Sequence, residues 1–470
     1  RGYFQETHPQ ELFRECSVYT EMVSVPDQLP GILEIAMRTA LARSGVAVIV
    51  VPGEVFLHGA GPVTPRAILP APPVARPDEA HLRRAADILN SARAVTILAG
   101  AGCQGAHEQV IGLAGTLKAP VVHAMRGKEF LEYDNPYDVG MTGLLGFSSG
   151  YRAMEHCDAL LMLGTDFPYR QFYPPPEVPV IQVDIRGEHI GRRVPVEVPL
   201  VGTVADTALA LTPLLHTKTD SEHLERMRRH YARARARLDR LASEDGNRSP
   251  LHPQYVTAVL DQLADDDAVF LADVGTLTVW AARYLRMNGR RRLLGSFTHG
   301  SMANALPQAI GVQASQPGRQ VITLSGDGGL AMLMGDLLTL RQLQLPVKIV
   351  VFNNGALSFV ELEMKAVGIV NYGTGLDNPD FAAVARAVGL HGVRVERPDE
   401  LQDALREALA HDGPALLDVA TARQELSMPP KLTAEQIRGF SLYAARTILS
   451  GRADDVVELA RTNLRALERE

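Results

Sequence analysis

The sequence contains little cysteine: only Cys16, Cys103 and Cys157 occur among 470 residues. They are widely spaced and lack metal-type spacing, which favours free thiols in a reducing cytoplasm. Basic residues are not in excess, because the net charge is −7, and the absence of a basic tract gives no indication of a nucleic-acid partner. Neither an apolar run of about 18 residues nor a signal peptide is found, so we expect no segment that spans a membrane.

Hydrophobic residues make up 46% of the chain, which is enough for substantial cores, and the length suggests two to four domains. The most informative stretch runs from Gln320 to Phe359. Short apolar runs at 320–325 and 347–352 flank a helical pattern at 330–344, and this order predicts a βαβ unit with parallel strands.

Asp327 follows the first of these strands and Asn354 follows the second. In parallel sheets ligands bind beyond the carboxyl ends of the strands, so the two side chains are expected to converge. A carboxylate, an amide oxygen and a nearby carbonyl suit Mg²⁺ that also holds phosphates. Glycines at 326, 328 and 329 allow the backbone to approach a diphosphate at a helix N-terminus.

A Gly-Asp-Gly sequence followed after 24 residues by Asn-Asn resembles the thiamine-diphosphate (ThDP) motif. Gly-Asp-Gly alone is usually just a turn, but the complete pattern between two strands is specific.

The rest of the chain divides by composition and periodicity. Residues 58–77 carry six prolines and read as a linker. The charged helix predicted within 217–248 alternates acidic and basic residues and reads as a solvated connection. The expected segments are 1–57 (the end of an α/β domain), 58–77 (linker), 78–216 (a second α/β unit), 217–248 (connecting helix), 249–428 (a third unit with the ThDP motif) and 429–470 (tail).

Within 78–216, the segment after the strand at 94–98 superficially matches a dinucleotide-binding fingerprint through Gly100, Gly102 and Gly105. By itself this match is weak. Asp184 ends a later strand, where an acidic residue often binds a ribose hydroxyl. The alternative is that Asp184 only caps the segment that follows.

Several stretches together resemble the ThDP- and FAD-dependent pyruvate oxidases, within the acetohydroxyacid synthase-like superfamily. The greatest likeness is to the quinone-reducing, membrane-associated type, pyruvate dehydrogenase (quinone). The stretches that carry it are 3–13, 127–143, 295–304 and 440–443. The resemblance implies an α/β fold of parallel-sheet domains with helices on both faces: pyrimidine-binding, FAD-binding and diphosphate-binding domains.

Residues 1–57 match only the last part of the pyrimidine-binding domain. The glutamate that activates ThDP in this family lies in the part without a counterpart here, so we expect these 470 residues to be a truncated form without catalytic activity.

By resemblance, Asp327 and Asn354 bind Mg²⁺ through their side chains and Ala356 through its carbonyl. Met302 matches a residue that wedges beneath ThDP, although ordinary core packing is the alternative. The Gly300 carbonyl is expected to accept a hydrogen bond from the aminopyrimidine. The other residues expected to bind the cofactor are Gly275, Thr276, Gly326, Gly328, Gly329 and Leu357.

Phe359 matches an aromatic residue near the reaction centre; the alternative is a core aromatic. Glu363 lies four residues further on the same helical face and is a candidate proton relay, although a solvated glutamate is nearly as probable on this pattern. Phe4 and Gln5 match residues that reach the active site of a partner subunit.

FAD is expected at a further set of positions. One departure lies at Thr203, where the family commonly has aspartate, and it puts one adenine-side contact in doubt. The expected FAD contacts are Gly100, Gly102, Met141, Thr142, Gly143, Gly164, Thr165, Asp166, Phe167 and Asp184.

The implied reaction is oxidative decarboxylation of pyruvate to acetate and CO₂ through hydroxyethyl-ThDP, with electrons passing through FAD to ubiquinone. The implied assembly is a homotetramer. One alternative is a carboligase of the acetolactate synthase type. Others are a phosphate-consuming oxidase, which the tail disfavours, and a non-catalytic protein that binds FAD or lipid.

The tail at 451–470 has an amphipathic helical pattern. Such a helix lies in a bilayer interface or packs on its own protein, and from physics alone the second is more common. The resemblance favours membrane lipid as a partner, with the enzyme peripheral on the cytoplasmic face of the inner membrane. The apolar face comprises Val456, Val457, Leu459, Ala460, Leu464 and Leu467.

Overall fold

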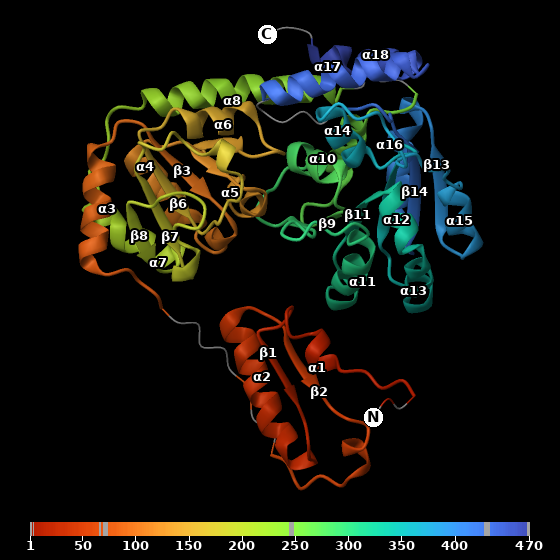
Figure 1. Cartoon of the computed structure of the whole chain (residues 1–470), viewed down its shortest axis with the longest axis horizontal. Coiled ribbons are helices and arrows are strands. Elements are labelled where there is room, and N and C mark those ends of the chain that lie inside the picture. The colour runs from red at the N-terminus through yellow and green to blue at the C-terminus, as the bar shows by residue number, and fades with distance from the viewer. Residues whose placement is uncertain are drawn as a thin grey trace. The chain divides into compact units, whose positions relative to one another are not determined.

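The computed structural model describes residues 2, 4–64, 67–68, 74–243, 249–426 and 433–467, with side chains as far as residue 463. The chain divides into two compact units, Arg1–Val74 and Ala75–Glu470 (Figure 1).

The first unit is small and exposes much of its apolar surface. Two parallel strands pair in register from Tyr19 with Ala47 to Met22 with Val50. Leu33, Ile35 and Leu41 of its long helix are each about half exposed. Its elements are α1 (Pro9–Leu12), β1 (Tyr19–Met22), α2 (Leu29–Arg43) and β2 (Ala47–Val50).

The first half of the second unit contains a six-stranded parallel sheet in the order β5-β4-β3-β6-β7-β8. Asp78 caps its first helix by accepting hydrogen bonds from the backbone amides of Ala80 and His81. The elements are α3 (Glu79–Ser91), β3 (Val95–Ala99), α4 (His107–Leu117), β4 (Val121–His123), α5 (Lys128–Leu131), β5 (Asp138–Met141), α6 (Ser148–Glu155), β6 (Ala159–Leu163), β7 (Val180–Asp184), β8 (Val198–Val201) and α7 (Val204–Leu211).

The second half contains another six-stranded parallel sheet, in the order β10-β9-β11-β12-β14-β13. The predicted βαβ unit is therefore present, since β11 and β12 are parallel neighbours. The elements are α9 (Pro253–Leu263), β9 (Val269–Ala272), α10 (Thr276–Tyr284), β10 (Arg292–Leu294), α11 (Ala305–Ser315), β11 (Val321–Gly326), α12 (Asp327–Met332), α13 (Leu337–Leu343), β12 (Lys348–Asn353), α14 (Ser358–Ala366), α15 (Phe381–Ala387), β13 (His391–Val395), α16 (Pro398–Ala410) and β14 (Ala415–Ala420).

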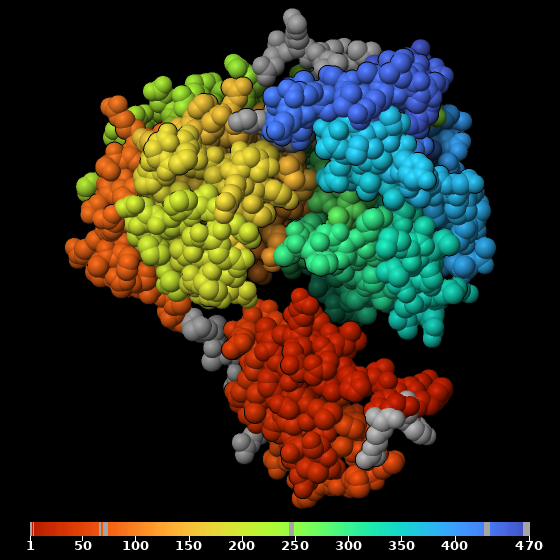
Figure 2. All heavy atoms as spheres, in the orientation of Figure 1, coloured from red at the N-terminus to blue at the C-terminus, as the bar shows by residue number. Residues whose placement is uncertain are grey.

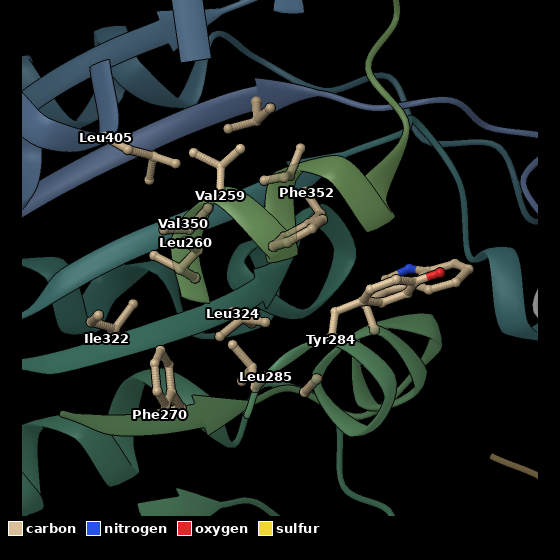
Figure 3. Packing of buried hydrophobic residues seen from close by; sticks show 14 of the residues in the cluster. Val259, Leu260, Phe270, Tyr284, Leu285, Ile322, Leu324, Val350, Phe352 and Leu405 are labelled. Atoms are coloured by element: carbon tan, nitrogen blue, oxygen red, sulfur yellow. The ribbon is translucent and has the colours of Figure 1, made fainter. Parts of the chain in front are cut away.

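Helices cover both faces of this sheet, as the alternation of buried side chains along each strand requires. Phe270, Leu324 and Phe352 belong to a core shared with α9, α10 and α16. Figure 3 shows Val259 and Leu260 of α9 lying over these strand residues. Leu271 belongs instead to the opposite core, with α11, α13 and α15. This α/β architecture confirms the predicted fold class.

Charged side chains join the two halves of the second unit. Glu129 accepts hydrogen bonds from the Arg292 guanidinium, at 3.1 Å to each carboxylate oxygen, and from the backbone amide of Leu293 at 2.9 Å. Buried Arg283, at the end of α10, donates to the carbonyls of Leu145 and Gly146 at 3.0 and 3.3 Å. Part of the 127–143 stretch that carries the family resemblance therefore holds the two sheets together.

Three long helices lie together on one side of the second unit (Figures 1 and 2). They are α8 (Glu222–Leu241), α17 (Ala434–Leu449) and α18 (Ala453–Leu467). Helix α17 packs against both α14 and α18. Of the helices in the described part of the chain, none is long and apolar enough to cross a membrane.

Some local predictions need correction. The helical pattern predicted over 330–344 forms two helices, α12 and α13, separated by a 3₁₀ turn at Met334–Asp336. The sequence pattern over 300–313 predicts a helix that opens at Gly300, but the helix begins at Ala305, because Gly300 and Ala303 both have positive φ. The tail helix is present as α18. Its Leu464 and Leu467 side chains lie outside the described residues.

Candidate functional site

A pocket of about 80 Å³ lies beyond the carboxyl ends of four strands of the C-terminal sheet. Asp273 and Gly275 follow β9, Asp327 follows β11, Asn354 follows β12, and Arg423 follows β14. The chain's single tryptophan, Trp280 of α10, also lines it. The strand order therefore brings together residues from positions 273 to 423 at one edge of the sheet.

Asp327 is buried and densely hydrogen-bonded. Its Oδ1 accepts from the backbone amide of Gly328 at 2.8 Å. Its Oδ2 accepts from the backbone amides of Asn354 and Gly355, at 3.2 and 2.7 Å, and from the side chain of Asn378 at 2.8 Å. Burial raises the pKa of this carboxyl group, and the four N–H donors oppose that rise.

Asn354 is held in a tight turn beside this carboxylate. Its Oδ1 accepts from the backbone amide of Ala356 at 3.0 Å, and its Nδ2 donates to the Ser358 hydroxyl at 2.7 Å. Asp327, Asn354 and Ala356 all line the same pocket, so the predicted carboxylate, amide and carbonyl donors are brought together.

These donors fit a hard cation by their chemistry. All three are oxygens, the kind of ligand that Mg²⁺ prefers. No cluster of three His, Cys, Asp or Glu side chains that could hold a metal is found among the described residues. The oxygens of Asp327, Asn354 and Ala356 stay the predicted metal ligands.

Two glycines leave the backbone exposed at the pocket. A Cβ atom at Gly329 would lie 1.9 Å from Oδ2 of Asp273, so only glycine fits against that carboxylate. Gly275 has a φ of 137°, which side chains disfavour, and precedes Thr276 at the start of α10. This exposed backbone and the unpaired amides of the first helical turn suit a diphosphate.

Met302 and Leu357 face each other across the Gly328 turn. A Cβ atom at Gly328 would lie 2.9 Å from Leu357 Cδ2 and 3.6 Å from Met302 Cε. Met302 is 36% exposed and lines the pocket, so it is not an ordinary core residue. Gly300 lies in the preceding turn with positive φ. Phe359 and Gly326 line the pocket as well.

Helix α14, which contains Phe359, carries two acidic residues with different environments. Glu363 is exposed and does not line the pocket, whereas Glu361 is 1% exposed. Glu361 Oε1 accepts from Thr374 Oγ1 at 2.9 Å and from Arg423 at 2.7 Å. Lys365 Nζ lies 3.4 Å from its Oε2. Burial opposes ionisation of Glu361, but Arg423 and Lys365 hold its pKa below the usual value.

Sequence reasoning missed three polar residues of this site. Asp273 is 2% exposed, accepts a hydrogen bond from Asn304 at 3.1 Å, and burial raises its pKa to about 6. Its place directly after a strand was a usable signal. Asn378 and Arg423 lie in loops without a recognisable pattern, so only the tertiary structure identifies them.

The residues predicted to bind FAD gather at the carboxyl edge of the central sheet. The loops after β3 and β6 are in direct contact, because the Gly102 amide donates to the Gly164 carbonyl at 2.9 Å and a Cβ atom at Gly102 would meet Gly164 Cα at 2.6 Å. Gly100 packs in the same way against Thr165. These glycines therefore already have a packing role without any ligand.

The other residues predicted to bind FAD differ in whether their polar groups already have partners within the protein. Asp166 is engaged by Arg193 at 2.9 Å and Arg192 at 2.9 Å. Phe167 lies against Gly143, where a Cβ atom would be 3.1 Å from the ring. Thr142, next to buried Met141, has a buried hydroxyl without a hydrogen-bond partner, a feature that fits a ligand at this edge.

Asp184 accepts from the backbone amide of Arg186 at 2.9 Å, consistent with the alternative of a local cap. Thr203 acts as the N-cap of α7 through the amide of Asp206 at 3.1 Å. FAD binding stays a prediction.

Phe4 and Gln5 belong to the first unit, whereas the pocket lies in the second. Phe4 is 81% exposed and Gln5 has a φ of 61°. Their reach into a partner's active site stays a prediction.

The described part of the tail helix is bound to its own protein. Asn463 of α18 accepts from the backbone amide of Leu426 at 3.0 Å and donates to the carbonyl of Gln424 at 2.8 Å. Thr462 is 3% exposed. Val457, by contrast, is 47% exposed. Membrane binding remains untested.

Two family patterns match the chain. Residues 82–211 match the pattern described as "Thiamine pyrophosphate enzyme, central domain", and residues 273–419 match "Thiamine pyrophosphate enzyme, C-terminal TPP binding domain". Thiamine pyrophosphate is another name for ThDP. The chain belongs to the thiamine pyrophosphate enzyme family.

Several curated proteins are similar to this chain. An uncharacterized 42.6 kDa protein in the isoamylase 3′ region of Pseudomonas amyloderamosa is 53% identical over 53% of this chain and 63% of its own length. The chain thus spans less than two thirds of that relative. The putative thiamine pyrophosphate-containing protein YdaP of Bacillus subtilis is 35% identical over 98% of this chain and 80% of its own length. Acetolactate synthase isozyme 2 large subunit of Escherichia coli is 29% identical over 91% and 77%.

These findings support a ThDP-dependent enzyme, and Mg²⁺ is typical of the family. They do not single out the pyruvate oxidases, since the similar proteins include acetolactate synthases.

Proposed function

We propose that this chain belongs to a carboligase that joins two 2-oxo acids with loss of CO₂. With pyruvate alone, two molecules would give acetolactate and one CO₂. The observation that carries the proposal is the alignment with acetolactate synthases over 91% and more of the chain.

The residues of the pocket suit this chemistry. Asp327, Asn354 and the Ala356 carbonyl would hold Mg²⁺, and Gly275, Gly328 and Gly329 would leave room for the diphosphate. When bound, ThDP supplies a carbanion that adds to the carbonyl of a 2-oxo acid and then takes up the electron pair released with CO₂.

Apolar side chains would orient the cofactor and exclude water. Met302 and Leu357 offer two facing apolar surfaces beside the Gly328 turn. Phe359 and Trp280 contribute aromatic wall to the same pocket. A dry pocket strengthens electrostatic interactions, which favours the loss of a carboxylate.

Cofactor binding can be tested with these 470 residues, because Trp280 is the only tryptophan and lines the pocket. We expect ThDP to change its fluorescence with saturation, and only when Mg²⁺ is present. Asp327→Ala should abolish the change. An unchanged signal, together with calorimetry that detects no ThDP binding, would overturn the proposal.

The reaction is tested with the protein at its native length, supplied with ThDP, Mg²⁺ and FAD. We expect pyruvate to give acetolactate and CO₂ in equal amounts. Loss of pyruvate without acetolactate would contradict carboligation.

Oxidation of pyruvate to acetate with a quinone acceptor is the second candidate function. The four stretches of family resemblance and the exposed Val457 of α18 favour it. Reduction of a quinone or dye in step with acetate formation, without acetolactate, would establish this reaction in place of the first.

A further inference from the structure

Arg423 lies at the end of the pocket formed by the loop after β14. It lines the pocket together with Asp327, Phe359 and Val360, and its side chain is 39% exposed. Among the described residues that line the pocket, Arg423 is the only one with a positive charge.

The buried carboxylate behind Arg423 is shared between two cations. Glu361 has two cationic partners, Lys365 at 3.4 Å and Arg423 at 2.7 Å. Lys365 is buried, donates to Gln424 at 2.8 Å and lies 5.7 Å from the centre of the Tyr443 ring. Asp455 of α18 pairs with Arg452. Because Lys365 is enclosed, Arg423 is the one of these two cations that reaches the pocket.

The guanidinium of Arg423 has donors to spare. Its hydrogen bond to Glu361 uses one nitrogen, whereas a guanidinium carries five N–H groups in a planar fork. Glu425, the nearby acid that also lines the pocket, is engaged by His252 at 2.6 Å and by Gln254. The ion pair with buried Glu361 fixes the direction of the fork.

We propose that Arg423, oriented by Glu361, binds the carboxylate of a 2-oxo acid substrate. Charge and planar geometry both suit a carboxylate, which accepts two parallel N–H bonds from such a fork. Phe359 and Val360 line the same pocket, so an acid with an apolar side chain suits it. This inference rests on the proposed function and adds a specificity-determining residue to it.

The test measures binding of an unreactive pair of probes by calorimetry, with Mg²⁺ and ThDP present. Oxamate resembles pyruvate and carries its carboxylate, while oxamide is its neutral counterpart. In the unaltered chain we expect oxamate to bind more tightly than oxamide. Arg423→Gln should weaken oxamate binding about tenfold or more, because a charged hydrogen-bonded pair is lost. The affinity for oxamide should be unchanged. The oxamate affinity of Arg423→Lys should fall between those of the unaltered chain and Arg423→Gln.

Arg406→Gln is the matched control, since Arg406 is exposed on α16 and pairs only with Asp403 in the described structure. It should bind oxamate normally. Folding of each variant is checked by its urea midpoint; Glu361 keeps Lys365 and Thr374 as partners when Arg423 is replaced.

Equal oxamate affinity in the unaltered chain and Arg423→Gln would overturn the inference, and so would absence of oxamate binding in the unaltered chain. Either result leaves ThDP binding and acetolactate formation, the measures of the proposed function, unaffected. In the native-length protein, Arg423→Gln should raise KM for pyruvate about tenfold. With pyruvate saturating as the donor, it should not alter KM for acetaldehyde, which has no carboxylate, as the acceptor.

Discussion

Replacing Asn378 with alanine should weaken the candidate metal site without touching any predicted ligand. The Asn378 amide donates both to Asp327 Oδ2 at 2.8 Å and to Asn353 Oδ1 at 2.9 Å. Asn353 in turn donates to buried Asp418 at 2.9 Å. Asn378 therefore ties the Asp327 carboxylate to the side-chain network between β12 and β14.

The magnitude follows from these two bonds. A hydrogen bond to a charged group contributes about 1.5 to 3 kcal/mol and one to a neutral group about 1 kcal/mol. We expect Asn378→Ala to lower the free energy of unfolding by about 2.5 to 4 kcal/mol. Removing a partner that orients a metal ligand typically lowers metal affinity by about 10- to 100-fold. We expect a similar loss in the Mg²⁺-dependent affinity for ThDP.

The loss of ThDP affinity should depend on pH. Burial already raises the pKa of Asp327, and the hydrogen bond from Asn378 opposes the rise. Without that bond the pKa rises further, and Mg²⁺ requires the ionised carboxylate. The defect in ThDP affinity should therefore be largest at low pH and shrink as the pH increases.

The assay is Trp280 fluorescence in a ThDP titration at several pH values, beside urea unfolding. Asn288→Ala is the control, because Asn288 also donates a side-chain hydrogen bond, to the Asp266 carbonyl at 2.8 Å, but does not line the pocket. It should lose stability and keep its ThDP affinity. Equal ThDP affinity in Asn378→Ala and the unaltered chain would refute the reasoning.

Three further predictions concern other parts of the molecule. Burial raises the pKa of Asp273 from 3.8 to about 6, so the stability it contributes is lost between about pH 4 and 6 as the pH rises. Asp273→Asn should therefore be more stable at pH 8 by up to about 3 kcal/mol and no more stable at pH 4, whereas a pH-independent difference in urea unfolding would contradict this. Gly329→Ala should lose about 1 to 3 kcal/mol of stability and its ThDP binding through the clash with Asp273. Gly335→Ala, where a Cβ atom meets nothing within 4 Å, should lose neither. Finally, if the tail binds lipid, pyruvate should shift the native-length protein into the floating fraction with liposomes, and equal soluble fractions with and without pyruvate would count against that binding.

The strands of the Gly-Asp-Gly to Asn-Asn stretch, and the polar residues that follow them, were predictable because their signals are local. Apolar runs of strand length, a helical period between them and polar residues after each strand specify a parallel βαβ unit. Asp327 and Asn354 follow β11 and β12 as expected, and both line the pocket.

Which face of helix α14 is buried was not predictable from such local signals. Glu363 was chosen because it lies four residues after Phe359, but Glu361 is the buried acid. Residues two apart on a helix differ by about 200° in direction, so burial depends on which neighbours cover the helix. Here Arg423 from β14's loop and Tyr443 from α17 surround the side of α14 that carries Glu361 and Lys365.

The sequence by itself determined the α/β fold, the parallel strands and the ThDP motif, because periodicity and glycine spacing act within a few tens of residues. Only the tertiary structure placed Asn378 on Asp327, Glu361 under Arg423 and Asn463 on the loop after β14. Those contacts join residues up to 62 positions apart. They depend on strand order and helix packing, which no local pattern in the sequence encodes.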